Sequence, residues 1–203
     1  MKYSIISGST RLNKNQSLKI AKFIENIILH TLKQEVFLLD LSSVSIKYWD
    51  ESFWKSHATF DSNWNKVRAE LSSSDGIVII APEWNGSIPP ALRNIFHLAV
   101  KGEFANKPAL LISVSSSING VYPIVELKIS SAKNSYINYI PQHIIIRNAT
   151  AVLNSNNSYT SEEDKIIQER IIYVLKVLNV YTENFIQIRN SDIIKNYPYP
   201  NGM

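Results

Sequence analysis

The sequence predicts a doubly wound α/β fold, in which a five-stranded parallel sheet carries helices on both faces. Short apolar runs rich in β-branched residues alternate along the chain with segments of helical period. Within the runs, apolar and polar residues do not alternate, which is typical of strands buried on both sides by helices. A length of 203 residues suits one domain with a sizeable core.

The strands are expected where the apolar runs lie. These runs are residues 3–7, 35–41, 76–81, 109–114 and 143–146. The right-handed crossover rule then leaves few topologies for the sheet. In such sheets, ligands bind beyond the carboxyl ends of the strands, at the point where the strand order reverses. We therefore expect the loops after the first, third and fourth strands to carry the chemistry.

The helices are expected where apolar residues recur at spacings of three and four. The stripes are Ile20, Ile24, Ile27 and Leu32; Trp64, Val67 and Leu71; Leu92, Ile95, Phe96 and Ala99; and Ile166, Ile167, Ile171, Val174, Leu175 and Leu178. The last stripe follows Thr160-Ser161-Glu162-Glu163, a capping-box pattern in which Thr160 and Glu163 would each satisfy a free amide at the helix end. We place one domain over residues 1–185 and a C-terminal extension over 186–203, which has no usable period.

Residues 42–60 form a long polar and aromatic stretch that we expect to cover the carboxyl edge of the sheet. The N-terminal apolar run is too short for a signal peptide, and no apolar run approaches the roughly 20 residues of a membrane span. The chain has no cysteine, which excludes disulfides, thiolate metal sites and cysteine nucleophiles and favours a reducing compartment. We expect a cytoplasmic protein without a membrane partner.

The charge pattern argues against nucleic acid as a partner. The formal net charge is +4, but lysines and arginines are scattered and form no run. This balance suits small anionic ligands. The sequence has no Gly-x-Ser-x-Gly elbow of an α/β-hydrolase. The four histidines, His30, His57, His97 and His143, show no metal-binding spacing, so no metal site is predicted.

The loop after the first expected strand, residues 7–17, runs directly into a helix. A helix N-terminus offers free amides and the positive end of the dipole, and Arg11 is able to hold a phosphate through two hydrogen bonds. The loop matches neither a Walker motif nor the dinucleotide fingerprint, because Gly8 is its only glycine. Phosphate binding and an ordinary hydrophilic turn with a helix cap are the two interpretations.

The loop after the third expected strand carries a strong turn signal in Asn85-Gly86. Ser87 is a candidate helix cap, and Pro89 or Pro90 suits the first helical turn. Such a turn has exposed amides that are able to bind the polar edge of a planar ring beside Trp84. The alternative is a plain strand-turn-helix connection with a core tryptophan.

Two motifs closely resemble the NADPH-dependent FMN reductase family, which includes quinone, chromate and azo-dye reductases. The motifs are Gly8-Ser9-Thr10-Arg11 with Gln16-Ser17-Leu18-Lys19-Ile20-Ala21, and the segment from Pro82-Glu83-Trp84-Asn85-Gly86-Ser87 to Asn94. The resemblance runs in outline to about residue 180. It implies a flavodoxin-like fold with strand order 2-1-3-4-5, bound FMN, NADPH (or NADH) as the hydride donor, and a homodimer or homotetramer. The helix over residues 89–100, with Phe96 and Leu98 on different faces, is a candidate surface for that assembly.

The resemblance also implies which residues bind the flavin. In the family the first loop binds the FMN phosphate and the second contacts the isoalloxazine ring. A third loop, residues 113–121, usually carries more glycine than the single Gly120 found here. The implied cofactor-binding residues are Ser9, Arg11, Asn15, Gln16 and Ser17 for the phosphate, and Pro82, Glu83, Trp84, Asn85, Gly86 and Ser115 for the ring.

The function predicted from this resemblance is an FMN-dependent NAD(P)H oxidoreductase that passes hydride to flavin and on to a quinone, a flavin or a similar small acceptor. Hydride transfer is the chemistry of the cofactor, so no catalytic acid or base is nominated. The same phosphate loop would equally serve a non-enzymatic electron carrier or a redox-sensing module. A family member that no longer binds flavin is a third alternative, suggested by the glycine-poor third loop.

Overall fold

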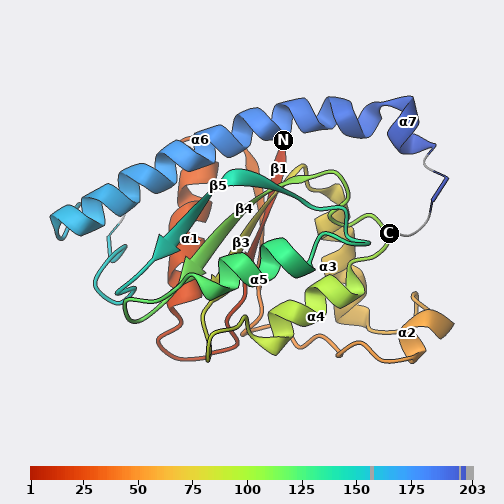
Figure 1. Ribbon diagram of the computed structural model, residues 1–203, viewed down its shortest axis with the longest axis horizontal. Coiled ribbons are helices and arrows are strands. Elements are labelled where there is room, and N and C mark those ends of the chain that lie inside the picture. Colours follow the sequence, from red (N-terminus) through yellow and green to blue (C-terminus); the bar gives the residue numbers. More distant parts are fainter. Residues whose placement is uncertain (156–157, 197, 200–203) are drawn as a thin grey trace.

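The described part of the chain forms one parallel five-stranded sheet between two layers of helices (Figure 1). The computed structural model describes residues 1–155, 158–196 and 198–199. The sheet has the order β2-β1-β3-β4-β5, which confirms the expected fold class. The strands are β1 (Lys2–Ser7), β2 (Glu35–Asp40), β3 (Gly76–Pro82), β4 (Pro108–Val114) and β5 (Asn138–Ile146).

The helices divide between the two faces of the sheet. They are α1 (Gln16–His30), α2 (Ser52–Lys55), α3 (Ser62–Ser73), α4 (Pro90–Leu98), α5 (Tyr122–Ser130), α6 (Glu162–Asn190) and α7 (Asp192–Lys195). Buried residues of α1 and α6 form one apolar cluster with the sheet, and those of α3, α4 and α5 form a second on the opposite face. Both faces of β3 are therefore buried, as its unbroken apolar run predicted.

The fifth strand differs from its expected extent. It begins at Asn138, five residues before the expected start at His143, and its pairing with β4 shifts register between Ala109 and Leu111. β5 is the edge strand, where an irregularity is able to accommodate Pro141. The alternating, partly exposed residues of its first half hide it from a search for continuous apolar runs.

The start of the last long helix also differs from the expectation. The capping residue is Ser161, whose hydroxyl accepts from the Asp164 amide, so the proposed pairing of Thr160 with Glu163 is wrong by one residue. Asp164 is fully buried, whereas Glu163 is exposed. Asp164 is able to bury its carboxylate among backbone amides, and Glu163 is not. The helix therefore begins one residue later, with Ser161 as its cap.

Helix α6 continues to Asn190, across the expected boundary between residues 185 and 186. In its last turn, Arg189 forms an ion pair with Asp75 at 2.8 Å and also donates to the backbone carbonyls of Asp75 and Asn106. These contacts hold the end of the helix against the segment before β3. Among the described residues, no helix has the length and apolar character needed to cross a membrane.

Two surface expectations are corrected by the structure. Residues 42–60 lie along α4, where the Asn94 side chain accepts from the Trp49 amide, and they contribute no residue to the cleft at the carboxyl edge. Phe96 and Leu98 of α4 are both buried in the core, so they form no outer surface. One group of exposed apolar residues lies on and before α5: Ile118, Val121, Tyr122, Val125 and Ile129.

Candidate functional site

The loops after β1, β3 and β4 meet at the carboxyl edge of the sheet around a cavity of about 300 Å³. Eight of the eleven expected cofactor-binding residues line it: Ser9, Arg11, Gln16, Ser17, Pro82, Glu83, Trp84 and Ser115. Asn15, Asn85 and Gly86 lie outside the lining. Lys14, Val114, Ser116 and Ser117 also line it and were not among the expected residues. Their signal was position alone, since Lys14, Val114 and Ser116 each adjoin an expected residue and Ser117 lies two positions after Ser115.

The first loop is held closely against the sheet. The Gly8 amide donates to the Ile80 carbonyl at 2.8 Å, and a Cβ at Gly8 would lie 2.8 Å from that same oxygen and 2.7 Å from Leu92. Asn15 caps α1 by accepting from the Leu18 amide, which explains why its side chain does not line the cavity. The loop therefore directs the N-terminus of α1 at the cavity.

Polar atoms at the start of α1 lack partners among the described residues. The Ser17 hydroxyl and the Gln16 side-chain oxygen are both buried and make no hydrogen bond within this part of the chain. Leaving such a group unsatisfied costs about 1–3 kcal/mol. The cations Arg11 and Lys14 line the same cavity. Free amides, a free hydroxyl and two cations at a helix N-terminus are the donor set that a phosphate requires.

The second loop is a tight turn. The Trp84 amide donates to the Ser87 carbonyl at 2.9 Å, and the Ser87 amide donates back at 3.0 Å. Asn85 and Gly86 have φ values of 51° and 73°, the left-handed pair that a type I′ turn requires. Ser87 donates to the Trp84 carbonyl and does not cap α4; Pro89 occupies that position and Pro90 follows in the first turn. The turn sets Trp84 at the cavity wall.

The third loop is joined to the second by a carboxylate. Glu83 accepts from the Gly120 amide at 2.7 Å, and the Ser113 hydroxyl donates to the Gly120 carbonyl. Gly120 has a φ of 115°, and a Cβ there would lie 2.7 Å from Ile145. Gly120, the single glycine of this loop, therefore stands where a side chain would collide with Ile145. Ser115 is buried, and its hydroxyl accepts from the Ser117 amide.

The histidines are absent from this cavity. None of His30, His57, His97 and His143 lines it. Within residues 1–155, 158–196 and 198–199, no group of three or more histidine, aspartate or glutamate side chains is arranged to hold a metal ion. The chemistry available at the cavity is therefore anion binding by the first loop, and hydrogen bonding beside an aromatic wall by the second and third loops.

A comparison with models of known protein families shows the family to which this chain belongs. Residues 1–150 match the model described as NADPH-dependent FMN reductase. The chain belongs to this family. It is an oxidoreductase, and its cofactors are FMN and NAD(P)H. The matched residues include all three loops that line the cavity.

Individual proteins are similar to this chain in sequence or in fold. An NADPH azoreductase from Bacillus sp. (strain OY1-2) is 23% identical over 184 residues, which are 90% of this chain and 96% of that protein. An oxidoreductase from Corynebacterium diphtheriae has a similar fold, with a TM-score of 0.70 at 12% identity over 90% of this chain and 97% of that chain. The flavoenzyme NAD(P)H:(acceptor) oxidoreductase FerB from Paracoccus denitrificans gives a TM-score of 0.65 at 17% identity, covering 92% and 97%.

Proposed function

We propose that this FMN reductase family member reduces quinones, flavins or similar small acceptors with hydride drawn from NAD(P)H. Flavin bound at the cavity would accept hydride from nicotinamide and pass it on, which is chemistry that the cofactor supplies. The observation that carries the proposal is the buried Ser17 hydroxyl, which has no partner among the described residues and lies in a cavity lined also by Arg11 and by the joined second and third loops. The protein contributes position and polarity, because correct positioning alone lowers such barriers by about 7–11 kcal/mol.

We propose two groups of residues for the flavin. Ser9, Arg11, Gln16 and Ser17 would hold the phosphate, with Asn15 fixing the helix end that faces it. The second group would hold the ring: Pro82, Glu83, Trp84, Asn85, Gly86 and Ser115. In that group Asn85 and Gly86 act through the turn that they form, and Glu83 acts by fixing the Gly120 backbone.

Arg11→Ala tests the phosphate assignment. Hydrogen bonds to a charged group contribute about 1.5–3 kcal/mol, so we expect FMN affinity to fall roughly tenfold to a hundredfold while the unfolding midpoint changes little. Fluorescence titration with FMN measures the first and urea unfolding the second. Lys22→Ala, which removes an exposed cation from α1 outside the cavity, is the matched control. Full flavin retention by the Arg11 variant would refute the assignment.

Ser17→Ala separates flavin binding from folding. Because the Ser17 hydroxyl is buried without a partner among the described residues, its removal should leave the flavin-free protein equally stable or up to about 1 kcal/mol more stable. FMN affinity should fall roughly tenfold, because the phosphate loses a donor. Loss of stability with unchanged FMN affinity would contradict this role.

The rival function is a non-enzymatic electron carrier or redox-sensing module. Mixing FMN-loaded protein with NADPH under anaerobic conditions distinguishes a reductase from a carrier or sensor. A reductase bleaches its flavin band directly, whereas a carrier needs a separate reductase. Steady-state NADPH oxidation with a quinone then tests the acceptor class. A flavin band that persists under NADPH would favour the carrier.

We also propose a cytoplasmic homodimer or homotetramer. The exposed side chains of Tyr122, Val125 and Ile129 support a contact between copies of this chain, because their spacing of three and four residues places them on one face of α5. Light scattering after size-exclusion chromatography measures the assembly. The division of the chain at residues 185 and 186 stays a prediction.

A further inference from the structure

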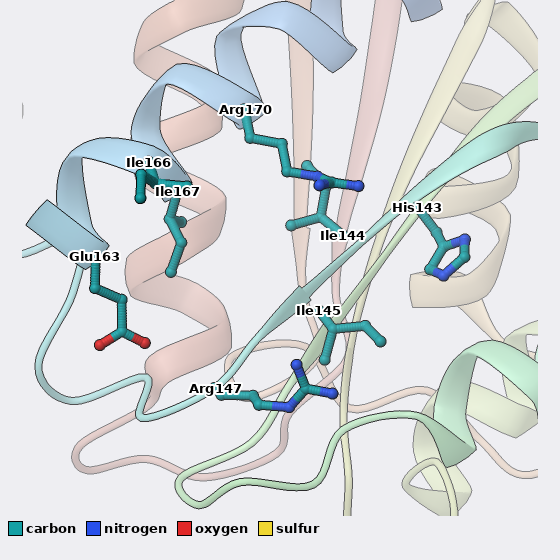
Figure 2. A pocket seen from close by; sticks show the side chains of 8 residues that line it. All are labelled: His143, Ile144, Ile145, Arg147, Glu163, Ile166, Ile167 and Arg170. Atoms are coloured by element: carbon teal, nitrogen blue, oxygen red, sulfur yellow. The ribbon is translucent and has the colours of Figure 1, made fainter.

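A second cavity lies outside the proposed flavin site, between the edge strand β5 and the first half of α6 (Figure 2). Its volume is about 540 Å³. The apolar part of its lining includes Ile145 from β5 and Ile166 and Ile167 from α6. Ile166 is 56% exposed, so the cavity opens to solvent along an apolar wall. An apolar wall of this kind suits a flat ring system.

Two arginines reach this cavity from different elements. Figure 2 shows Arg170 extending from α6 toward Ile144, and Arg147 leaving the end of β5 below Ile145. Arg170 is exposed and has no ion-pair partner among the described residues. Arg147 donates through Nε to the carbonyls of Ile118 at 2.6 Å and Asn119 at 3.1 Å. Those bonds orient its guanidinium and leave its terminal nitrogens for another acceptor.

The local charge balance is positive. Burial, together with the positive charges of Lys128 and Arg170, holds the pKa of His143 below its usual range, so this histidine is neutral at pH 7. One carboxylate, Glu163, stands at the side of the cavity away from His143. Guanidinium groups beside an apolar wall recognise a phosphate attached to a planar base, because the fork geometry matches phosphate oxygens.

The cavity adjoins the proposed flavin site through the third loop. Ser115, Ser116 and Ser117 line the flavin cavity, and the next two residues provide the carbonyls that hold Arg147. Residues 116–119 are exposed. A dinucleotide with its nicotinamide at the flavin would therefore cross the third loop. Its adenosine half would then lie on the side of the loop where Arg147 is held.

From these contacts we propose that the cavity between β5 and α6 binds the adenosine 2′-phosphate half of NADPH, with Arg170 at the 2′-phosphate, Arg147 at the phosphates that cross the third loop, and the isoleucine wall under the adenine. Glu163 supplies an acceptor for a ribose hydroxyl or the adenine amino group. The site then selects NADPH over NADH, because NADH lacks the 2′-phosphate. This inference rests on the proposed reductase function and extends it to the choice of donor.

Calorimetric titration of the FMN-loaded protein with adenosine 2′,5′-bisphosphate tests the site without turnover. Binding of this probe should be at least about tenfold tighter than binding of adenosine 5′-monophosphate. Arg170→Ala should remove most of that difference, and Arg170→Lys should restore part of it. Lys176→Ala removes a charge from an exposed position of the same helix outside the cavity and should change nothing. Equal binding of the two nucleotides to the unmodified protein would overturn the proposal.

Steady-state kinetics give the second measurement. Arg170→Ala should raise the KM for NADPH roughly tenfold or more and leave the KM for NADH and the kcat unchanged. An equal effect on both donors would overturn the proposal. A free FMN acceptor also carries a phosphate on a planar ring, so FMN is compared with riboflavin. A raised KM for FMN alone would assign the cavity to the acceptor and refute the assignment to NADPH.

The two proposals fail in distinguishable ways. If the reductase function is wrong, the unmodified protein does not bleach its flavin with either donor. If only the donor site is wrong, the flavin is retained and bleaches, while the Arg170 variants behave as the Lys176 control.

Discussion

Gly120→Ala is expected to lose about 3 kcal/mol of unfolding free energy and most of its FMN affinity. An alanine at a φ of 115° is strained by about 1–3 kcal/mol, and its Cβ would meet Ile145 at 2.7 Å, which adds an overpacking cost of similar size. Relief of that contact requires the third loop to move. The loop would then lose the bond from the Gly120 amide to Glu83, which joins two walls of the proposed flavin cavity.

Gly102→Ala is the matched control for this prediction. Gly102 has a similar φ of 97°, but no atom lies within 4 Å of a Cβ built there. Its replacement should cost only the backbone strain, about 1–2 kcal/mol, and leave FMN affinity unchanged. Urea unfolding and flavin titration of both variants separate the cost of backbone strain from the cost of the contact with Ile145. Equal losses at the two positions would show that contact with Ile145 is unimportant.

Asp164→Ala is expected to lose about 4 kcal/mol of unfolding free energy. The fully buried Asp164 carboxylate accepts from the Leu153 amide at 2.8 Å, from the amide and hydroxyl of Thr160 at 2.9 Å each, and from Gln168 at 3.2 Å. Each buried donor left without a partner costs about 1–3 kcal/mol. Asp164 therefore fastens the segment after β5 to the start of α6. Urea unfolding at pH 7 measures the loss.

Glu162→Ala is the control, since Glu162 is an exposed acid in the same helical turn. It should lose no more than about 1 kcal/mol, the contribution of a charge near the helix dipole. Asp164→Asn should remain strongly destabilised, because the amide presents a donor to groups that are themselves donors. A loss at Asp164 no larger than at Glu162 would contradict the structural role.

Because of Asp164, we expect the free energy of unfolding to depend on pH. Burial raises the pKa of Asp164, but the hydrogen bonds from Leu153, Thr160 and Gln168 outweigh it and hold the pKa below its usual range. The resulting stabilisation is complete above the unfolded-state value of about 3.9 and is lost as the pH falls through the lower folded-state value. Unfolding midpoints measured from pH 6 downward should therefore converge for the unmodified protein and Asp164→Ala.

The sequence by itself determined the fold class and the position of the first loop at the sheet edge. Apolar runs without alternation identify buried parallel strands, and the Asn85-Gly86 pair specifies its turn, because both signals depend on neighbouring residues. The two-motif resemblance identified the family that the comparison then matched over residues 1–150. The roles of the nominated cofactor-binding residues stay predictions.

The tertiary structure alone decided the features that depend on distant partners. Ser161 rather than Thr160 caps α6 because Asp164 is able to reach Leu153, and α6 extends to Asn190 because Arg189 meets Asp75. Gly120 is fixed in the third loop because its amide donates to Glu83, which comes from the loop after β3. Local patterns report periodicity and turn chemistry, whereas a buried hydrogen bond or ion pair forms only after the sheet has brought separate segments together.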